Sequence, residues 1–206
     1  MSTITYAGAK EGVTSFRTKI QLPAQGAWRI CCDCDQQIPV GTAVEVLFRG
    51  VTFKGTVVVS EQQARTYHLD IRPGAGLTRT VSAKPYFSGG VGPMVQEAVS
   101  ASGEKLHIGS AMPTGLKNWF RPPGQTLPQI LGQLGVLWHC HSSGEVIVGS
   151  VWPEVTTGDS YFLGAHPQAG VQQVMLEPET FVWPSASVQA VEYVETANFV
   201  RCTVQI

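Results

Sequence analysis

Short runs of alternating apolar and polar residues, separated by glycine and proline, dominate the N-terminal third of the chain. One run has polar residues between Phe16, Thr18, Ile20 and Leu22. This alternation is expected of a strand with one face against a core. Further runs of this kind lie at residues 27–34, 42–50, 51–61 and 65–73. Five or six strands joined by short turns predict a small barrel or sandwich rather than βαβ units.

The next part of the chain mixes helix and strand. Residues 94–103 predict a short helix closed by Gly103. Thr126 can cap a second helix with Gln129 in the capping-box position, and Gly135 weakens its last turn. The apolar stripe of that helix is Ile130, Leu131, Leu134 and Leu137. A β-hairpin with a Ser-Ser-Gly turn follows at residues 136–152.

The C-terminal quarter returns to short alternating strands with Pro, Gly or Asn at the joins. The predicted fold is therefore mainly β, with two small β-barrel modules joined by a compact α+β insert. We expect the first barrel at residues 1–84, the insert at 85–153, and a second, smaller barrel at 154–206.

Low charge indicates an assembly protein. Charged residues make up 14% of the 206 residues, against about 25% in typical soluble domains. Uncharged polar residues enter an interface without the desolvation cost of Lys and Glu. The formal net charge of −1 gives no general reason to expect nucleic acid binding. Residues 152–206 carry a single cation against six acids and form an acidic module.

Targeting features are absent from the sequence. The N-terminal residues lack the apolar core of a signal peptide, and no run approaches the ~20 apolar residues that cross a bilayer. We therefore expect synthesis in a cytoplasm and no membrane insertion. Five cysteines, an odd number, do not form an evident disulfide framework, so reduced thiols are expected.

Two patches of Cys and His leave a chemical role open. A zinc site could combine Cys32 and Cys34 with His139 and His141, if their two strands met, but these strands belong to different predicted modules. Buried, inert cysteines are the simpler interpretation. A cysteine hydrolase would use Cys140 or Cys32 as nucleophile with His139 or His107 as base, although no third, orienting residue can be named. We expect no catalytic residue, no metal and no cofactor.

Aromatic residues supply the candidate interface. Trp119, Phe120 and Arg121 precede two prolines and form either a packed loop or an anchor for a partner. The other four tryptophans sit in strand-like runs and are expected in the core or at an interface: Trp28, Trp138, Trp152 and Trp183.

The order of these segments carries a resemblance to a known family. The family pattern begins with a strand that contains aromatic-x-Gly-x-Val. A strand with Tyr follows, and then a Pro. In this chain the residues that match are Phe53, Gly55, Val57, Tyr67, Leu69 and Pro73. A segment ending in an aromatic residue before a helix follows, with Pro85, Tyr86, Phe87 and Val95. The aromatic loop, Leu-rich helix and hydrophobic hairpin complete the order with Trp119, Phe120, Gly124, Thr126, Ile130, Leu131, Leu134, Trp138 and residues 146–148.

In this order the chain resembles the phage tail (baseplate) hub family, which includes the late control protein D family and the N-terminal region of the secretion spike protein VgrG. The resemblance implies a structural virion protein at the tail tip, assembled in the host cytoplasm and not an enzyme. It also implies a homotrimer whose pseudo-six-fold ring adapts the tail tube to the tip. The implied partners are the tail tube or distal tail protein, a tip, spike or fibre protein, and the tape measure protein. The alternatives are a secretion-system spike component and a small cysteine hydrolase or zinc-binding domain of the tail tip. Family members are commonly longer than this chain, so we expect the second barrel to be built from fewer residues than theirs.

Overall fold

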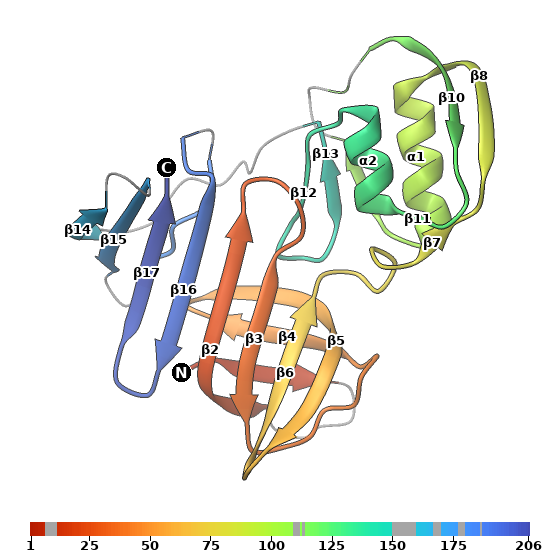
Figure 1. The fold of residues 1–206 in the computed structure, drawn as a ribbon. Helices are drawn as coiled ribbons and strands as arrows, with labels where there is room; N and C mark the ends of the chain where they lie inside the picture. Colours follow the sequence, from red (N-terminus) through yellow and green to blue (C-terminus); the bar gives the residue numbers. More distant parts are fainter. Residues whose placement is uncertain are drawn as a thin grey trace.

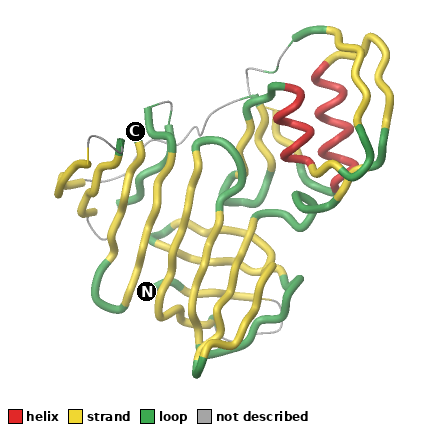
Figure 2. Tube along the Cα trace, in the orientation of Figure 1, coloured by secondary structure: helices red, strands yellow, loops and turns green. Residues whose placement is uncertain are grey.

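The computed structural model describes residues 1–6, 12–108, 112, 114–149, 160–166, 170–176, 180–185 and 187–206. Figure 1 shows three parts: a barrel, a sheet that extends from its side, and a lobe that holds both described helices. Strands predominate over helices throughout the tube view of Figure 2. The prediction of a mainly β protein is confirmed.

Six antiparallel strands form the barrel. Their order is β1-β4-β5-β6-β3-β2, and pairing of β1 with β2 closes the circle. The bounds are β1 (Thr3–Tyr6), β2 (Val13–Pro23), β3 (Arg29–Cys34), β4 (Ala43–Phe48), β5 (Val51–Gln63) and β6 (Thr66–Arg72). Closure leaves these strands without the exposed edge that an open sheet presents.

The inward face of β2 differs from the simple alternation expected from the sequence. Thr18 and Ile20 are fully buried, but Phe16 is 47% exposed. The register against β3 shifts between Ser15 and Arg17, where a β-bulge turns the preceding residues to the other face. Ser15 therefore points inward and Phe16 outward, so the expected core position of Phe16 is wrong.

Aromatic side chains fill the barrel. Trp28 and Phe53 meet edge to face, with ring centroids 5.4 Å apart. A Cβ atom at Gly55 would lie 2.8 Å from the Trp28 ring and 2.6 Å from the Arg72 carbonyl oxygen. The glycine in the Phe53-x-Gly55-x-Val57 pattern is thus required by close packing of β5 against β6 and the tryptophan.

The C-terminal strands extend the same sheet. β16 (Ala190–Thr196) pairs with β2, and the order continues through β17 (Val200–Gln205) and β15 (Val171–Leu176) to β14 (Ser160–His166). In the described part of the chain these four strands form an open sheet, and no described strand pairs with the outer edge of β14.

The C-terminal part shares the barrel core. The Phe181 ring lies 6.1 Å from Phe53 and 4.9 Å from Tyr193, and the Tyr193 hydroxyl donates to the Val182 carbonyl oxygen over 2.9 Å. Barrel and open sheet therefore pack as one hydrophobic unit. The predicted boundary between residues 153 and 154 lies outside the described residues, so the division into modules stays a prediction. Trp152 lies outside them too.

The lobe holds the remaining elements: β7 (Thr80–Val81), β8 (Lys84–Gly90), α1 (Val91–Ser102), β9 (Leu106–Ile108), β10 (Leu116–Arg121), β11 (Gln125–Thr126), α2 (Leu127–Leu134), β12 (Trp138–Cys140) and β13 (Val146–Val148). Gly103 closes α1 in the left-handed conformation, as predicted. The capping box of Thr126 and Gln129 is present at α2. The helix ends one turn earlier than expected, because Gly135 adopts a φ of 69°, and Leu137 lies beyond it, 42% exposed.

The predicted β-hairpin joins the lobe to the barrel. β12 and β13 pair antiparallel as expected, and β9 adds a parallel strand. The indole N–H of Trp28 donates to the His141 carbonyl oxygen over 2.9 Å, and the Lys54 backbone N–H donates to the Ser142 carbonyl oxygen over 2.7 Å. Neither α1 nor α2, with 12 and 8 residues, could span a membrane.

Candidate assembly surface

The three residues predicted as an interface lie on β10, which pairs with β8 to form a two-stranded ribbon over α1. Trp119 pairs with Tyr86, and Phe120 pairs with Pro85. Because successive side chains of a strand point to opposite faces, Trp119 and Arg121 share one face and Phe120 lies on the other. The ribbon thus has an inner face toward α1 and an outer face toward solvent.

The inner face is fixed by a buried arginine. Arg121 is fully buried, and its Nη1 and Nη2 groups donate to the Glu97 carboxylate on α1 over 2.7 Å and 3.2 Å. Its Nε–H donates to the Ser82 carbonyl oxygen over 2.8 Å. The Tyr86 hydroxyl donates to the same carboxylate, and the Tyr86 and Trp119 rings stack with centroids 5.6 Å apart. These contacts lock the ribbon onto α1.

The protonation of this cluster follows from its contacts. Burial alone would raise the pKa of Glu97, but hydrogen bonds from Arg121 and Tyr86 outweigh it, so the pKa lies below its ordinary value. Burial and the hydrogen bond to Glu97 raise the pKa of Tyr86 to about 12. At neutral pH the cluster therefore contains an ionised carboxylate, a neutral phenol and a guanidinium.

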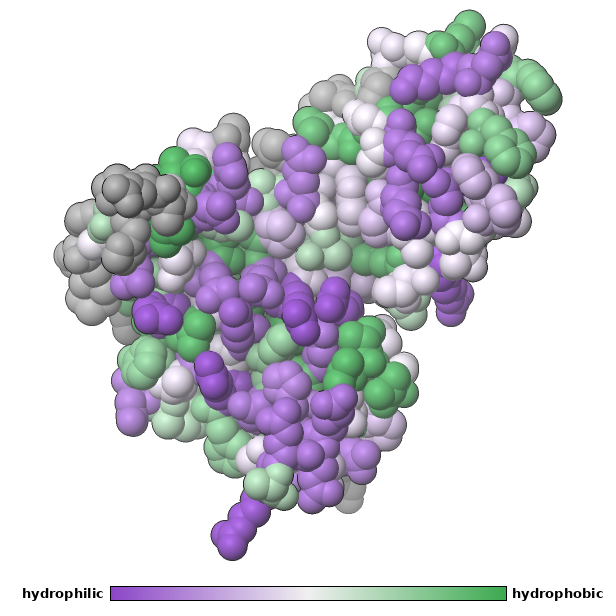
Figure 3. Space-filling view, in the orientation of Figure 1, coloured by the Kyte–Doolittle hydropathy of each residue, from purple (hydrophilic) through white to green (hydrophobic). Residues whose placement is uncertain are grey.

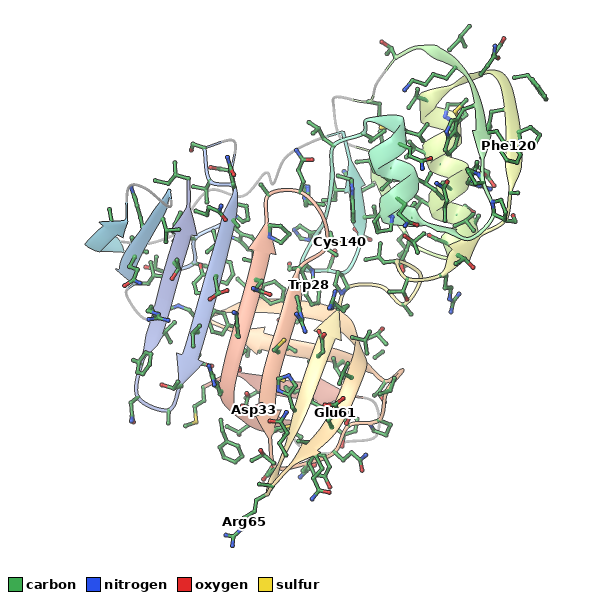
Figure 4. All side chains as sticks on the ribbon, in the orientation of Figure 1. Trp28, Asp33, Glu61, Arg65, Phe120 and Cys140 are labelled. Carbon is green, nitrogen blue, oxygen red and sulfur yellow. The ribbon has the colours of Figure 1, made fainter. Side chains whose placement is uncertain are left out.

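The outer face carries unusually exposed apolar side chains. Phe87 is 84% exposed, Leu116 74% and Phe120 58%; we call these three residues the apolar ribbon surface. The lysines of the ribbon reach the inner side instead, where Lys84 Nζ lies 3.7 Å from the Glu97 carboxylate and Lys117 Nζ donates to the Leu134 carbonyl oxygen over 3.4 Å. Figure 4 shows Phe120 at the outer side of the lobe, far from Cys140 and Trp28 where lobe and barrel meet. Exposed apolar side chains gathered in this way mark interaction sites.

The structure brings the three predicted interface residues onto one ribbon but divides them between its faces. Arg121 and Trp119 hold the ribbon in place, and Phe120 is the one presented to solvent. Sequence reasoning did not select Phe87 or Leu116 for this surface. A signal for Phe87 was present, since it alternates with Pro85 around the inward Tyr86.

The cysteines lie in apolar surroundings. Cys32 and Cys34 are buried on one face of β3 and Cys31 lies on the other, as the alternation predicts. Burial raises the pKa of the Cys32 and Cys140 thiols far above its ordinary value, which keeps them protonated at neutral pH. Across the described residues, no three His, Cys, Asp or Glu side chains come together in a group that could hold a metal ion.

Three of the four other predicted tryptophans lie among the described residues, and all three are buried. Trp28 is fully buried, Trp138 is 9% exposed and Trp183 is 7% exposed. These three tryptophans belong to the core, one of the two places expected for them.

Comparison with known proteins gives matches among structures alone. No family model matches the chain, and no curated protein matches it. A 43 kDa tail protein of prophage MuSo2 from Shewanella oneidensis has a TM-score of 0.70 at 10% identity, over 98% of this chain and 96% of that one. A tail protein from Neisseria meningitidis MC58 has a TM-score of 0.71 at 9% identity, over 98% and 94%.

A third similar structure is the E. coli c3393 protein, described as a component of the type VI secretion system with structural similarity to the T4 bacteriophage tail proteins gp27 and gp5. Its TM-score is 0.69 at 9% identity, over 98% of this chain and 75% of that one. Identities this low show a shared fold and no more. The chain therefore has a fold found in phage tail proteins and in a secretion-system component.

Proposed function

We propose that the chain is a structural protein of a phage tail, a hub at which the tail tube meets the tail tip. The observation that carries the proposal is the full-length match of its fold to solved tail proteins, over 98% of the chain. The order of motifs from Phe53 to the hairpin at residues 136–152 supports the same assignment. The protein would reside in the virion, at the tail tip, after assembly in the host cytoplasm.

In this proposal three copies form the hub. Each copy supplies two β modules, the closed barrel and the open C-terminal sheet, so that three copies present six modules to a six-fold tube. No described strand pairs with the outer edge of β14, which leaves room there for a strand of the next copy in the proposed ring. DNA would pass through the ring without being bound.

The apolar ribbon surface is the proposed contact with a neighbouring tail protein, either the tube or distal tail protein or a tip, spike or fibre protein. Its side chains offer apolar area on a backbone already locked by Arg121, so little ordering is needed on binding. The tape measure protein is a further proposed partner.

The state of two thiols argues against the alternative of a cysteine hydrolase and so favours a structural role. A nucleophilic cysteine requires a lowered pKa, and burial raises the pKa values of Cys32 and Cys140 instead. The second candidate is a component of a secretion system, which the likeness to the E. coli c3393 protein favours. Both candidates are assembly proteins, and the tube protein that the chain binds distinguishes them.

Co-assembly with purified tail-tube and tail-tip proteins tests the proposal. The wild-type chain should join one of them in a complex visible by electron microscopy. Phe87→Ser with Phe120→Ser should lose that complex while keeping its own oligomeric state. Arg65→Gln, at the exposed tip of the barrel in Figure 4, is the matched control and should assemble normally. A wild-type chain that joins neither protein would contradict the tail assignment.

A further inference from the structure

Charged side chains gather on one outer face of the barrel, although the chain as a whole is poor in charge. Figure 3 shows this face as a hydrophilic area over β2, β3 and β6. The charged residues that β2, β3, β6 and β16 contribute to it are Arg17, Lys19, Arg29, Asp33, Asp70, Arg72 and Glu192. Glu61 of β5 lies beside them, because it pairs with His68, which in turn pairs with Asp33.

The centre of this face is an arginine pair held over a buried carboxylate. Asp70 points outward from β6 but is only 5% exposed, because Arg29 and Arg72 cover it. The Arg29 Nη2 group lies 2.9 Å from Asp70 Oδ2, and the Arg72 Nε and Nη2 groups each lie 3.1 Å from a carboxylate oxygen. Each guanidinium has five N–H donors, so Asp70 fixes both side chains without using all their hydrogens.

A cavity adjoins this arginine pair. It has a volume of about 500 Å³ and lies where the barrel meets the C-terminal sheet, lined by Arg29, Arg72 and Glu192 together with the apolar Pro23, Ala27 and Ala190. A second hollow of about 370 Å³, lined by Arg17, Lys19 and Asp33, shares Gln21 and Arg29 with it. The two hollows adjoin at Gln21 and Arg29, and we call them together the groove; the first has the apolar lining residues and the second is lined mainly by charged and polar residues.

We propose that this groove binds an extended segment of a partner protein in which an acidic side chain neighbours an apolar one. The carboxylate would accept hydrogen bonds from the free N–H groups of Arg29 and Arg72, and the apolar side chain would fill the cavity beside Pro23 and Ala190. Because Asp70 already holds both guanidiniums in place, binding orders few further side chains.

A protein segment fits this groove better than nucleic acid does. A phosphate backbone presents a negative charge at every nucleotide and would meet Asp33 and Glu192 between the cations. A segment with a single carboxylate beside an apolar side chain meets the arginines alone. Peptide binding to the groove can be measured on the isolated chain, so its outcome is separate from that of the tail assignment.

Nuclear magnetic resonance titration of the full chain tests the groove. The probe is the capped peptide acetyl-Ile-Glu-Val-amide, compared with the same peptide carrying Gln in place of Glu and with inorganic phosphate. The Glu peptide should shift backbone signals of β2, β3, β6 and β16, and the Gln peptide should bind at least about tenfold more weakly. Sodium chloride should weaken the Glu peptide more than the Gln peptide.

Variants decide whether the arginine pair is responsible. Arg29→Gln with Arg72→Gln should lower the affinity for the Glu peptide at least about tenfold, because the charge-assisted hydrogen bonds are lost. The double variant leaves the Asp70 carboxylate without its two arginine partners and can fold poorly for that reason. A triple variant that adds Asp70→Asn removes this unpaired charge and serves for the same binding test. Arg65→Gln with Lys105→Gln removes the same charge elsewhere and should bind as the wild type does.

Three results would overturn the proposal. The first is equal binding of the Glu and Gln peptides, or no binding of either at millimolar concentration. The second is an equal loss of affinity in the Arg65 and Lys105 control. The third is a shift of the groove signals by phosphate alone, which would mean a simple oxyanion site with no role for the apolar cavity.

Discussion

Two arginine–carboxylate clusters in this molecule are built in opposite ways. In the lobe the cation is buried: Arg121 has no exposed surface, whereas Glu97 is 32% exposed. On the barrel face the anion is buried: Asp70 is 5% exposed, whereas Arg29 and Arg72 are 43% and 42% exposed. The buried member of each cluster has lost its water and depends on its partners.

The two clusters therefore have different roles: one holds a strand in place, and the other presents hydrogen-bond donors to solvent. In the lobe, the contacts of Arg121 tie β10 to α1, and the outer face of the ribbon is then free to carry Phe87 and Phe120. On the barrel, Asp70 holds two guanidiniums whose remaining donors face solvent. One cluster thus supports an apolar surface behind it, and the other is itself the proposed surface.

The largest effect is expected from Glu97→Gln, which leaves the Arg121 charge buried without a carboxylate. The free energy of unfolding should fall by about 3 kcal/mol, the lower end for breaking a buried ion pair, because Glu97 is partly exposed. Urea denaturation measures the change. Lys84→Gln, which removes a cation 3.7 Å from the same carboxylate, should cost less than about 1 kcal/mol. Equal losses in the two variants would show that the burial of Arg121 does not matter.

Asp70→Asn should have a smaller effect, about 1 to 2 kcal/mol, because the half-exposed Arg29 and Arg72 can regain water when the carboxylate is lost. The same denaturation experiment compares it with Glu97→Gln. A loss larger than that of Glu97→Gln would reverse the contrast between the two clusters.

Acid titration sharpens the comparison further. Burial would raise the pKa of Asp70, but hydrogen bonds from Arg72 and Arg29 hold it below the ordinary value. Its contribution to stability is therefore fully present above about pH 4 and is lost as the pH falls through the lowered pKa. The stability gap between the wild type and Asp70→Asn should close over that range.

Glu104 is a control for the acid titration, because its pKa is shifted in the direction opposite to that of Asp70. Burial raises its pKa even though the Gly76 backbone N–H donates to its carboxylate. The folded state therefore binds the Glu104 proton more tightly than the unfolded state does, and the stability of the wild type relative to Glu104→Gln should rise as the pH falls. If the Asp70 and Glu104 gaps changed in the same direction, the assignment of the two environments would be wrong.

The smallest effect on stability is expected at the outer face of the ribbon. Phe87→Ser should change the free energy of unfolding by no more than about 0.5 kcal/mol, because the side chain is 84% exposed. Thermal unfolding of this variant should match that of the wild type. Trp119→Ser, which removes the ring stacked on Tyr86, should destabilise the lobe measurably in the same assay.

Local sequence patterns predicted the barrel strands and one end of each helix well, because neighbouring residues determine these features. Alternation gave the barrel strands, Gly103 the end of α1, and Thr126 with Gln129 the start of α2. Where a strand left simple alternation the expectation failed, since the bulge at Ser15 depends on pairing with β3 and moves Phe16 out of the core.

The candidate surfaces were less accessible to sequence reasoning because they depend on contacts between distant residues. Trp119, Phe120 and Arg121 were selected together, but Glu97, distant in the sequence, decides that Arg121 faces inward. The groove depends on Arg29, Asp70 and Arg72, which come together only when β3 pairs with β6. No motif in the linear sequence marks such a set.

We propose that this chain assembles into a three-fold hub of a phage tail. Native mass spectrometry of the purified chain, alone and with tail-tube protein, measures that assembly. We expect a mass of three copies and a complex of this trimer with the tube protein. A monomer that persists at high concentration and never joins the tube protein would contradict it.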